Sequence, residues 1–171
     1  MKRLDLREYD LGEKMTMEVQ LIRATTKDAE HIWKMQVESF SALLDKYEDF
    51  ETNPASEPVD RVIERLKQSS TYYYYIKVSE DIVGAIRVIN DLKNGQKWIS
   101  PLFVLPKFQN QGIAQKAIAK VEELHGAANW KIATILQEEG NCHLYEKMGY
   151  YKTGKTKVIN ERMTLVYYQK D

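Results

Sequence analysis

The sequence has very little cysteine, and this scarcity limits the chemistry that it can support. Among its 171 residues there is a single cysteine, Cys142. One cysteine cannot form an internal disulfide or a cysteine-built zinc site, which agrees with a reducing compartment. The three histidines, His31, His125 and His143, do not pair with a second ligand at a known metal spacing. We therefore expect no metal centre and a cytoplasmic protein.

The chain also lacks a long hydrophobic run and an excess of charge of either sign. No apolar stretch approaches the roughly 20 residues that a membrane helix needs, and the charged start has no apolar segment of the signal-peptide type behind it. The 25 basic residues balance 25 acidic ones, so no overall field attracts nucleic acid or an anionic membrane. Neither partner is expected, while a monomer and a homodimer both stay open.

What the sequence does have is the composition of one folded domain. A chain of 171 residues, of which 43% are hydrophobic, is long enough to bury a core. Residues 1–17 are charged and show little periodicity, so we interpret them as an N-terminal extension of unknown role. Residues 18–171 form the predicted domain.

Hydrophobic periodicity divides this domain into strand-like and helical segments. Strands are predicted over 19–24, 71–78, 82–89, 97–105, 130–136, 150–158 and 163–169, and helices over 26–44, 56–66, 113–124 and 141–148. The strands between 71 and 105 are separated by short turns and form an antiparallel meander, whereas the later strand, helix, strand order implies a parallel crossover. The fold class is therefore α/β, with a mixed, mostly antiparallel sheet and about four helices.

Two local patterns refine this fold. The tyrosines at 72–75 alternate between the two faces of a strand, which favours packing over a platform for a ligand. Pro101 has no N–H group to donate inside a strand, so it marks either a bulge or an edge.

The segment from Ile99 to Gln115 organises the chain. An apolar β-type run ends at Pro106, and apolar residues recur at helical spacing from Ile113 onward, so Gly112 lies at a helix entrance. A glycine lets a ligand approach the backbone closely, while the free N–H groups and the roughly +0.5 charge of the helix dipole attract anions. Because the turn has no cluster of lysines, the sequence predicts a phosphate site built mainly from backbone donors.

Two motifs carry a resemblance to a known family. The order Gln109-x-x-Gly112-x-Ala114, after a strand and at the start of an amphipathic helix, resembles the acyl-CoA pyrophosphate loop of the GNAT superfamily of N-acetyltransferases. The segment from Asn141 to Tyr150 resembles the second cofactor helix of that family, with its asparagine, its tyrosine and its closing glycine-aromatic pair. Two linked elements in the right order are more specific than one, and the resemblance covers about residues 18–171.

The resemblance implies where the co-substrate, acetyl-CoA, would bind. GNAT folds splay the central sheet at the third meander strand, so a bulge is expected at Pro101 and the pantetheine arm is expected in the gap. Contacts with the cofactor are then expected from Phe103, Val104, Leu105, Gln109, Gln111, Gly112, Ile113, Ala114, Gln115 and Asn141.

Tyr145 is the candidate catalytic residue. In the resembling family the tyrosine at this point donates a proton to the coenzyme A sulfur, and ordinary pKa values of about 8.5 for a thiol and about 10 for a tyrosine make this feasible. Packing under the final hairpin is the alternative for Tyr145, and a helix cap is the alternative for Asn141. Cys142 has no histidine at a productive helical spacing, so direct transfer is preferred to an acyl-cysteine intermediate.

The general base is absent from its usual place. Many GNAT enzymes carry a glutamate on the third meander strand, but Trp98 to Leu105 contains no carboxylate. The main hypothesis is an acyltransferase that moves an acetyl group from acetyl-CoA to a primary amine of a small molecule or peptide. The alternative is a non-catalytic acyl-CoA-binding domain of the same fold that has lost the base.

The resemblance places the acceptor at the loop between the first two helices. This loop combines acids with aromatic rings, and its candidate substrate-binding residues are Tyr47, Glu48 and Asp49. Acids and ring faces suit a cationic amine. A solvated loop whose acids touch nothing is the alternative.

A competing motif lies near the end of the chain. Gly149 to Thr156 matches the nucleotide-triphosphate loop Gly-x4-Gly-Lys-Thr letter for letter. That loop needs a strand before it and a helix after it, whereas here a helix is predicted before it and a hairpin after it. We therefore reject a nucleoside triphosphatase.

Overall fold

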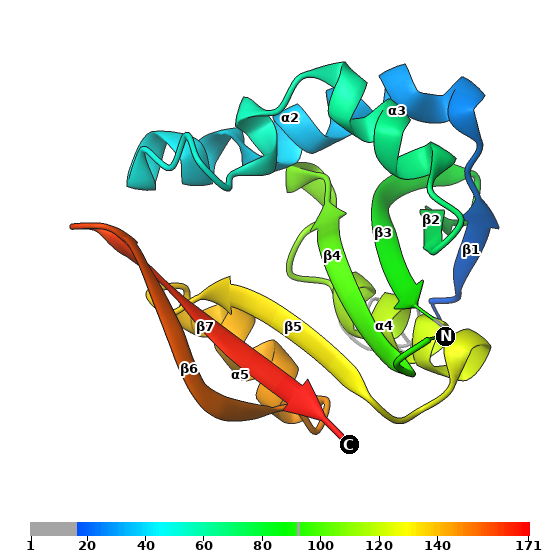
Figure 1. The fold of residues 1–171 in the computed structure, drawn as a ribbon. Coiled ribbons are helices and arrows are strands. Elements are labelled where there is room, and N and C mark those ends of the chain that lie inside the picture. The colour runs from blue at the N-terminus through cyan, green and yellow to red at the C-terminus, as the bar shows by residue number, and fades with distance from the viewer. Residues whose placement is uncertain (1–16, 92) are drawn as a thin grey trace, which may run out of the picture.

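The computed structural model describes residues 17–91 and 93–171, which form a seven-stranded sheet with helices on both faces (Figure 1). The strands are β1 (Val19–Arg23), β2 (Thr71–Val78), β3 (Asp81–Asp91), β4 (Gln96–Val104), β5 (Trp130–Ile135), β6 (Tyr151–Asn160) and β7 (Met163–Lys170). The helices are α2 (Ala29–Tyr47), α3 (Val59–Lys67), α4 (Ile113–His125) and α5 (Glu139–Lys147), with short 3-10 turns η1 (Thr26–Asp28), η2 (Pro54–Ser56) and η3 (Pro106–Phe108).

The strand order is β1-β2-β3-β4-β5-β7-β6, and the β4–β5 pair is its parallel pair. These two strands pair at only two positions, Lys97 with Trp130 and Trp98 with Lys131. Beyond these positions β4 and β5 separate, as Figure 1 shows. The predicted mixed sheet with a splayed parallel pair is therefore confirmed, as is the antiparallel meander of β2, β3 and β4.

The sheet has a buried core on each face. The first core lies under α4 and includes Ile86, Val88 and Ile118. The second core lies under α2 and α3 and includes Ile32 and Phe103. The four tyrosines of β2 alternate between them, because Tyr73 and Tyr75 belong to the second core while Tyr72 and Tyr74 pack with the first. The packing interpretation of this run is confirmed.

Pro101 lies in a bulge rather than at an edge. In the β3–β4 pairing, Ile86 is opposite Leu102 and Val88 is opposite Ile99, so Arg87 alone faces both Ser100 and Pro101. The extra residue changes the register within the central sheet, where a proline without an N–H group is tolerated. The expected bulge is present, two residues beyond the point where β4 leaves β5.

The closing hairpin places β6 at the outer edge of the sheet. Residues 151–158 are all exposed, and β6 follows α5 directly after Gly149. The segment that matches the nucleotide loop is therefore mostly an edge strand that follows a helix. This arrangement confirms that the match does not mark a nucleoside triphosphatase. Across residues 17–91 and 93–171, no helix is both long enough and apolar enough to cross a lipid bilayer.

Candidate active site

The turn at Gly112 connects the end of β4 to α4. Gly112 has a φ of 79°, a left-handed conformation that favours glycine, and a Cβ built there would meet no atom within 4 Å. The first backbone hydrogen bond of α4 runs from the Lys116 N–H group to the Gly112 carbonyl at 3.2 Å. The N–H groups of Ile113, Ala114 and Gln115 precede that bond and have no backbone acceptor in the described chain. The turn thus presents open space in front of free donors.

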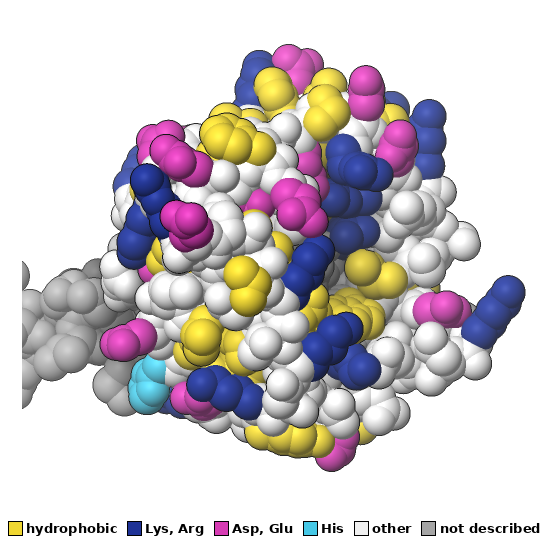
Figure 2. Space-filling model, turned by 60° about the vertical axis from the view of Figure 1, so that its left-hand side comes forward, with side chains coloured by type: hydrophobic (Ala, Val, Ile, Leu, Met, Phe, Trp, Pro, Cys, Tyr) yellow, Lys and Arg dark blue, Asp and Glu magenta, His cyan; other side chains and the backbone are white. Residues whose placement is uncertain are grey.

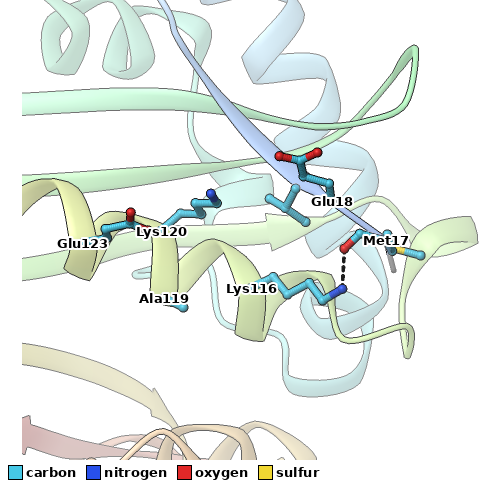
Figure 3. A pocket seen from close by; sticks show the side chains of 7 residues that line it. Met17, Glu18, Lys116, Ala119, Lys120 and Glu123 are labelled. Atoms are coloured by element: carbon cyan, nitrogen blue, oxygen red, sulfur yellow. Dashed lines mark hydrogen bonds between the residues drawn. The ribbon is translucent and has the colours of Figure 1, made fainter. Parts of the chain in front are cut away.

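The nearest lysine of α4 does not serve this turn. The Lys116 ammonium donates to the carbonyl of Met17, two residues before β1, in a groove between β1 and α4 (Figure 3). The groove is also lined by Glu18, Lys120 and Glu123. Lys116 therefore ties α4 to β1, and backbone dipoles are left to attract an anion at Gly112.

The predicted cofactor residues of β4 lie on different sides of the sheet. Val104 is in the core under α4, whereas the buried Phe103 ring packs edge-on against Phe40 of α2 at 5.8 Å. Phe103 thus has only its main chain available to a ligand at the splay. Gln109 closes the turn, because its Nε2 donates to the Val104 carbonyl at 3.0 Å. Leu105 is half-buried beside the second core, and its N–H group donates to the Val83 carbonyl.

Helix α5 begins two residues earlier than predicted. Its N-cap is Glu138, so Asn141 lies inside the first turn with its side chain exposed, and the helix-cap alternative for Asn141 is wrong. Cys142 is buried, and its Sγ lies 3.7 Å from the Ile135 carbonyl and 3.8 Å from the Leu136 carbonyl. This thiol anchors α5 to the end of β5, which agrees with direct transfer rather than an acyl-cysteine.

Tyr145 is buried, with 9% of its surface exposed. Its ring centroid lies 6.1 Å from those of Tyr150 and Tyr168. Burial raises the pKa of the Tyr145 hydroxyl to about 12, so the hydroxyl keeps its proton at neutral pH. Tyr150 donates to Glu122 at 2.9 Å and Tyr168 donates to Glu146 at 3.0 Å. The Tyr145 hydroxyl has no such partner among the described residues.

The other side of the splay holds a network that the sequence did not predict. Glu138 lies where the end of α2 meets the start of α5, and its Oε2 accepts from the Tyr47 hydroxyl at 2.7 Å and from the Lys46 ammonium at 2.9 Å. Partial burial opposes the charge on Glu138, but these two donors outweigh it and hold its pKa below the ordinary value. The Tyr47 carbonyl also accepts from Asn160 Nδ2 at 2.9 Å. Tyr47 is therefore buried where the end of α2, the start of α5 and the end of β6 meet.

The acids of the α2–α3 loop are already engaged. Asp49 is only 1% exposed, and its carboxylate accepts from the N–H groups of Glu51 and Thr52 and from the Thr52 hydroxyl. This corrects the expectation that Asp49 faces an ammonium group, because its oxygens hold the turn instead. Glu48 is exposed and lies 3.7 Å from Arg162, while Glu51 lies 3.1 Å from Lys157.

Figure 2 brings forward the side of the molecule that contains this loop and the β6–β7 turn. Lys and Arg side chains gather there in a band beside hydrophobic side chains. Glu48 and Glu51 of the loop pair with Arg162 and Lys157 of the hairpin, so the loop is not the purely acidic surface that its sequence alone predicts.

The sequence model of the Acetyltransferase (GNAT) family matches residues 32–150. The chain belongs to this family. The matched residues include both the Gly112 turn and Tyr145. The GNAT chain is therefore an acyltransferase, and acetyl-CoA is the co-substrate that this family uses. Its turn fits such a group, since a left-handed glycine with open space is followed by free N–H donors.

Solved structures share this fold at low sequence identity. The microcin C7 self-immunity acetyltransferase MccE, crystallised with acetyl-CoA and AMP, has a TM-score of 0.67 at 18% identity over 88% of this chain and 91% of its own. The spermidine N-acetyltransferase from Vibrio cholerae, with CoA and spermine, scores 0.70 at 15% identity over 88% and 93%. RimL, a ribosomal L7/L12 α-N-protein acetyltransferase, scores 0.66 at 12% identity over 90% and 93%. No curated protein matches the chain by sequence.

Two residues of this GNAT chain were missed by sequence reasoning. Glu138 follows a strand at a loop and carries no motif, and its partners are 91 and 92 residues away. Arg87 lies inside a strand that is otherwise apolar, from Ile82 to Ile89. A charged residue in the middle of such a strand was a signal that could have been used, because arginine is rarely buried without a reason.

Proposed function

We propose that this GNAT enzyme transfers an acetyl group from acetyl-CoA directly to a primary amine of a small molecule or peptide. The observation that carries the proposal is the Gly112 turn, whose free N–H groups open the helix that follows the strand that parts from β5. We also propose a cytoplasmic location, which the single cysteine supports.

In this proposal the backbone at Gln111 to Gln115 binds the pyrophosphate of acetyl-CoA. Val104 and Leu105 contact the pantetheine arm, and Asn141 is exposed on the first turn of α5, free to hydrogen-bond the same arm. Acetyl-CoA supplies the acetyl group as a thioester. The protein supplies orientation, because the two separating strands fix where the thioester carbonyl lies.

Tyr145 is the proposed partner of the leaving sulfur. With a pKa of about 12 against about 8.5 for a thiol, complete proton transfer from Tyr145 to the thiolate is uphill by roughly 5 kcal/mol. A hydrogen bond from a hydroxyl that keeps its proton has no such cost, and it is strongest when charge develops on the sulfur. Tyr145 therefore stabilises the departing thiolate, which takes its final proton from water.

The amine must reach the thioester without its proton. Strand β4 has no carboxylate between Trp98 and Val104, and the pKa of Glu138 is held low, which makes that carboxylate a weak base. We propose that the ammonium proton leaves through water, as it can do for an amine whose own pKa is low in the site.

The proposal is tested by mixing the protein with acetyl-CoA and a panel of amines and following the free thiol. We expect thiol release that depends on one class of amine and that yields one acetylated amine per thiol, measured by mass spectrometry. Cofactor binding without thiol release from any amine would instead support the non-catalytic acyl-CoA-binding domain.

A further inference from the structure

Arg87 is a buried cation on β3. Only 7% of its surface is exposed, and its Nε donates to the carbonyl of Ser100 in the β4 bulge. Its cross-strand partner on β2 is Tyr73, which belongs to the core under α2 and α3. Ala85, two residues before Arg87, faces the same core. Arg87 therefore extends from the α2 face of the sheet, opposite to α4.

The surrounding residues do not neutralise this charge. Glu57, the acid whose charge acts on Arg87, already accepts two hydrogen bonds of 2.7 Å from Arg65 and one of 3.0 Å from Gln36. Burial and then the neighbouring Arg65 lower the pKa of Arg87 to about 10, so it stays charged at neutral pH. Arg65 therefore occupies this carboxylate, and in the described chain Arg87 forms no ion pair with it. An uncompensated buried charge is costly, so its presence requires an explanation.

The terminal nitrogens of Arg87 have free hydrogen-bonding capacity. In the described chain, Nε is the one nitrogen of the Arg87 side chain that has a protein acceptor. The one side-chain atom of the described residues that is both fully enclosed and without a hydrogen-bond partner is Ser39 Oγ. The two terminal nitrogens of Arg87, which have no partner, are therefore not fully enclosed. These two nitrogens, which form the fork of the guanidinium group, reach accessible space. Support of the bulge carbonyl uses one N–H group and leaves four in a planar array, the geometry that matches a carboxylate or phosphate group.

The place of this fork matters for catalysis. Arg87 touches Ser100, which is exposed and lies two residues beyond the last residue of β4 that pairs with β5. The proposed thioester site starts where the two strands part. An amine that approaches from the α2 face would pass directly beside Arg87.

We propose that Arg87 binds an oxoanion, a carboxylate or a phosphate, on the acceptor, so that the acceptor is an amine that also carries a negative group. This inference rests on the proposed acetyl transfer. A cation beside the amine also favours its neutral form, which explains how the site works without a carboxylate on β4. The ion pairs of Glu48 and Glu51 with hairpin cations agree with it, because they remove the attraction for a polycationic acceptor.

The anion site is tested first without catalysis. The protein is saturated with CoA, so that the Gly112 turn is filled, and then titrated with inorganic phosphate or with acetate while its melting temperature is measured. We expect stabilisation in the wild type and in the control R61M, since Arg61 is exposed on α3 and its ion pair within the described residues is with Glu64. R87M should lose it. If R87M does not fold, R87K is used, which keeps the charge but not the fork and should bind at least about tenfold more weakly.

The acceptor class is tested with matched pairs: phosphoethanolamine with ethanolamine, glycine with glycinamide, and spermidine as the cationic amine. We expect the anionic member to have a kcat/KM at least about tenfold higher, and R87M or R87K to reduce this preference through KM. The phosphate and carboxylate pairs distinguish the two sources of the anion.

A preference for the neutral or cationic amine, or phosphate binding that is unchanged in the Arg87 variants, would overturn the inference and leave acetyl transfer standing. Arg87-dependent phosphate binding with no thiol release from any amine would overturn acetyl transfer instead.

Discussion

The two sides of the splayed sheet are built in different ways. On the cofactor side, the phosphate turn is built from the consecutive residues Val104 to Lys116 and presents backbone N–H groups at a glycine. On the acceptor side, the contacts join residues that are far apart, such as Lys46 with Glu138 and Tyr47 with Asn160, which are 92 and 113 positions apart. The first site follows from local chain geometry, and the second exists only once the whole fold has formed.

The largest expected effect is on the cofactor side. Gly112→Val places a β-branched side chain at a φ of 79° and fills the open space in front of the N–H donors. We expect the thermal stabilisation by saturating acetyl-CoA, about 2.7 kcal/mol at a hundredfold excess over Kd, to disappear. The matched control is Gly154→Val, because Gly154 has a φ of 89° and equally open space but lies in β6. Both variants carry a strain of about 1–2 kcal/mol, and only the first should lose cofactor binding.

The next effect separates catalysis from binding on the same side. Tyr145→Phe keeps the buried ring and removes a hydroxyl that has no protein partner in the described chain, so the free energy of unfolding should hardly change. Turnover is expected to fall by on the order of 10²-fold with an unchanged KM for acetyl-CoA. The control is Tyr168→Phe, whose hydroxyl donates to Glu146 and not to the proposed sulfur site. Equal turnover in wild type and Tyr145→Phe would make Tyr145 a packing residue.

A smaller effect is expected from the network on the acceptor side. Glu138→Gln removes the ion pair with Lys46 and should lower the free energy of unfolding by about 1 kcal/mol at pH 7. The folded-state pKa of Glu138 lies below its unfolded value, so this stability is complete above the unfolded pKa and is lost as the pH falls through the folded pKa. Denaturation by urea at a series of pH values should show the two proteins converging in acid. A difference that persists there would exclude the ion pair as its cause.

The smallest effect on acceptor binding is expected from the loop that the sequence favoured. Glu48→Gln removes an exposed 3.7 Å pair with Arg162, so the KM for the amine should change by less than about threefold. Asp49→Asn should act on the turn instead, with a loss of about 1–2 kcal/mol of stability and an unchanged KM. Acceptor kinetics that show a large rise in KM for Glu48→Gln would return the acceptor site to this loop.

This contrast explains what could be predicted from the sequence. The helix entrance at Gly112 and the alternation of the β2 tyrosines follow from glycine and a period of two, which act locally. Proline alone left a bulge and an edge open at Pro101, and the resemblance to the GNAT family implied the bulge that the structure contains. The roles of Asp49 and Glu138 could not be predicted, because each depends on what folds against it. Asp49 looks like an available acid in the sequence, but its own turn uses both oxygens. The insertion of β7 between β5 and β6 was likewise not predicted, since pairing partners are a property of the fold.

The exposed edge strand has a consequence for how copies of this protein meet in solution. An edge of a sheet offers unpaired backbone groups, and a second copy can add to it and extend the sheet into an aggregate. One of the two edges here is β6, which carries Lys152, Lys155 and Lys157 in an exposed stretch. Two such edges would bring like charges together as they aligned. These lysines therefore protect the protein from sheet extension, and their replacement by threonine is expected to show as light scattering that rises with protein concentration.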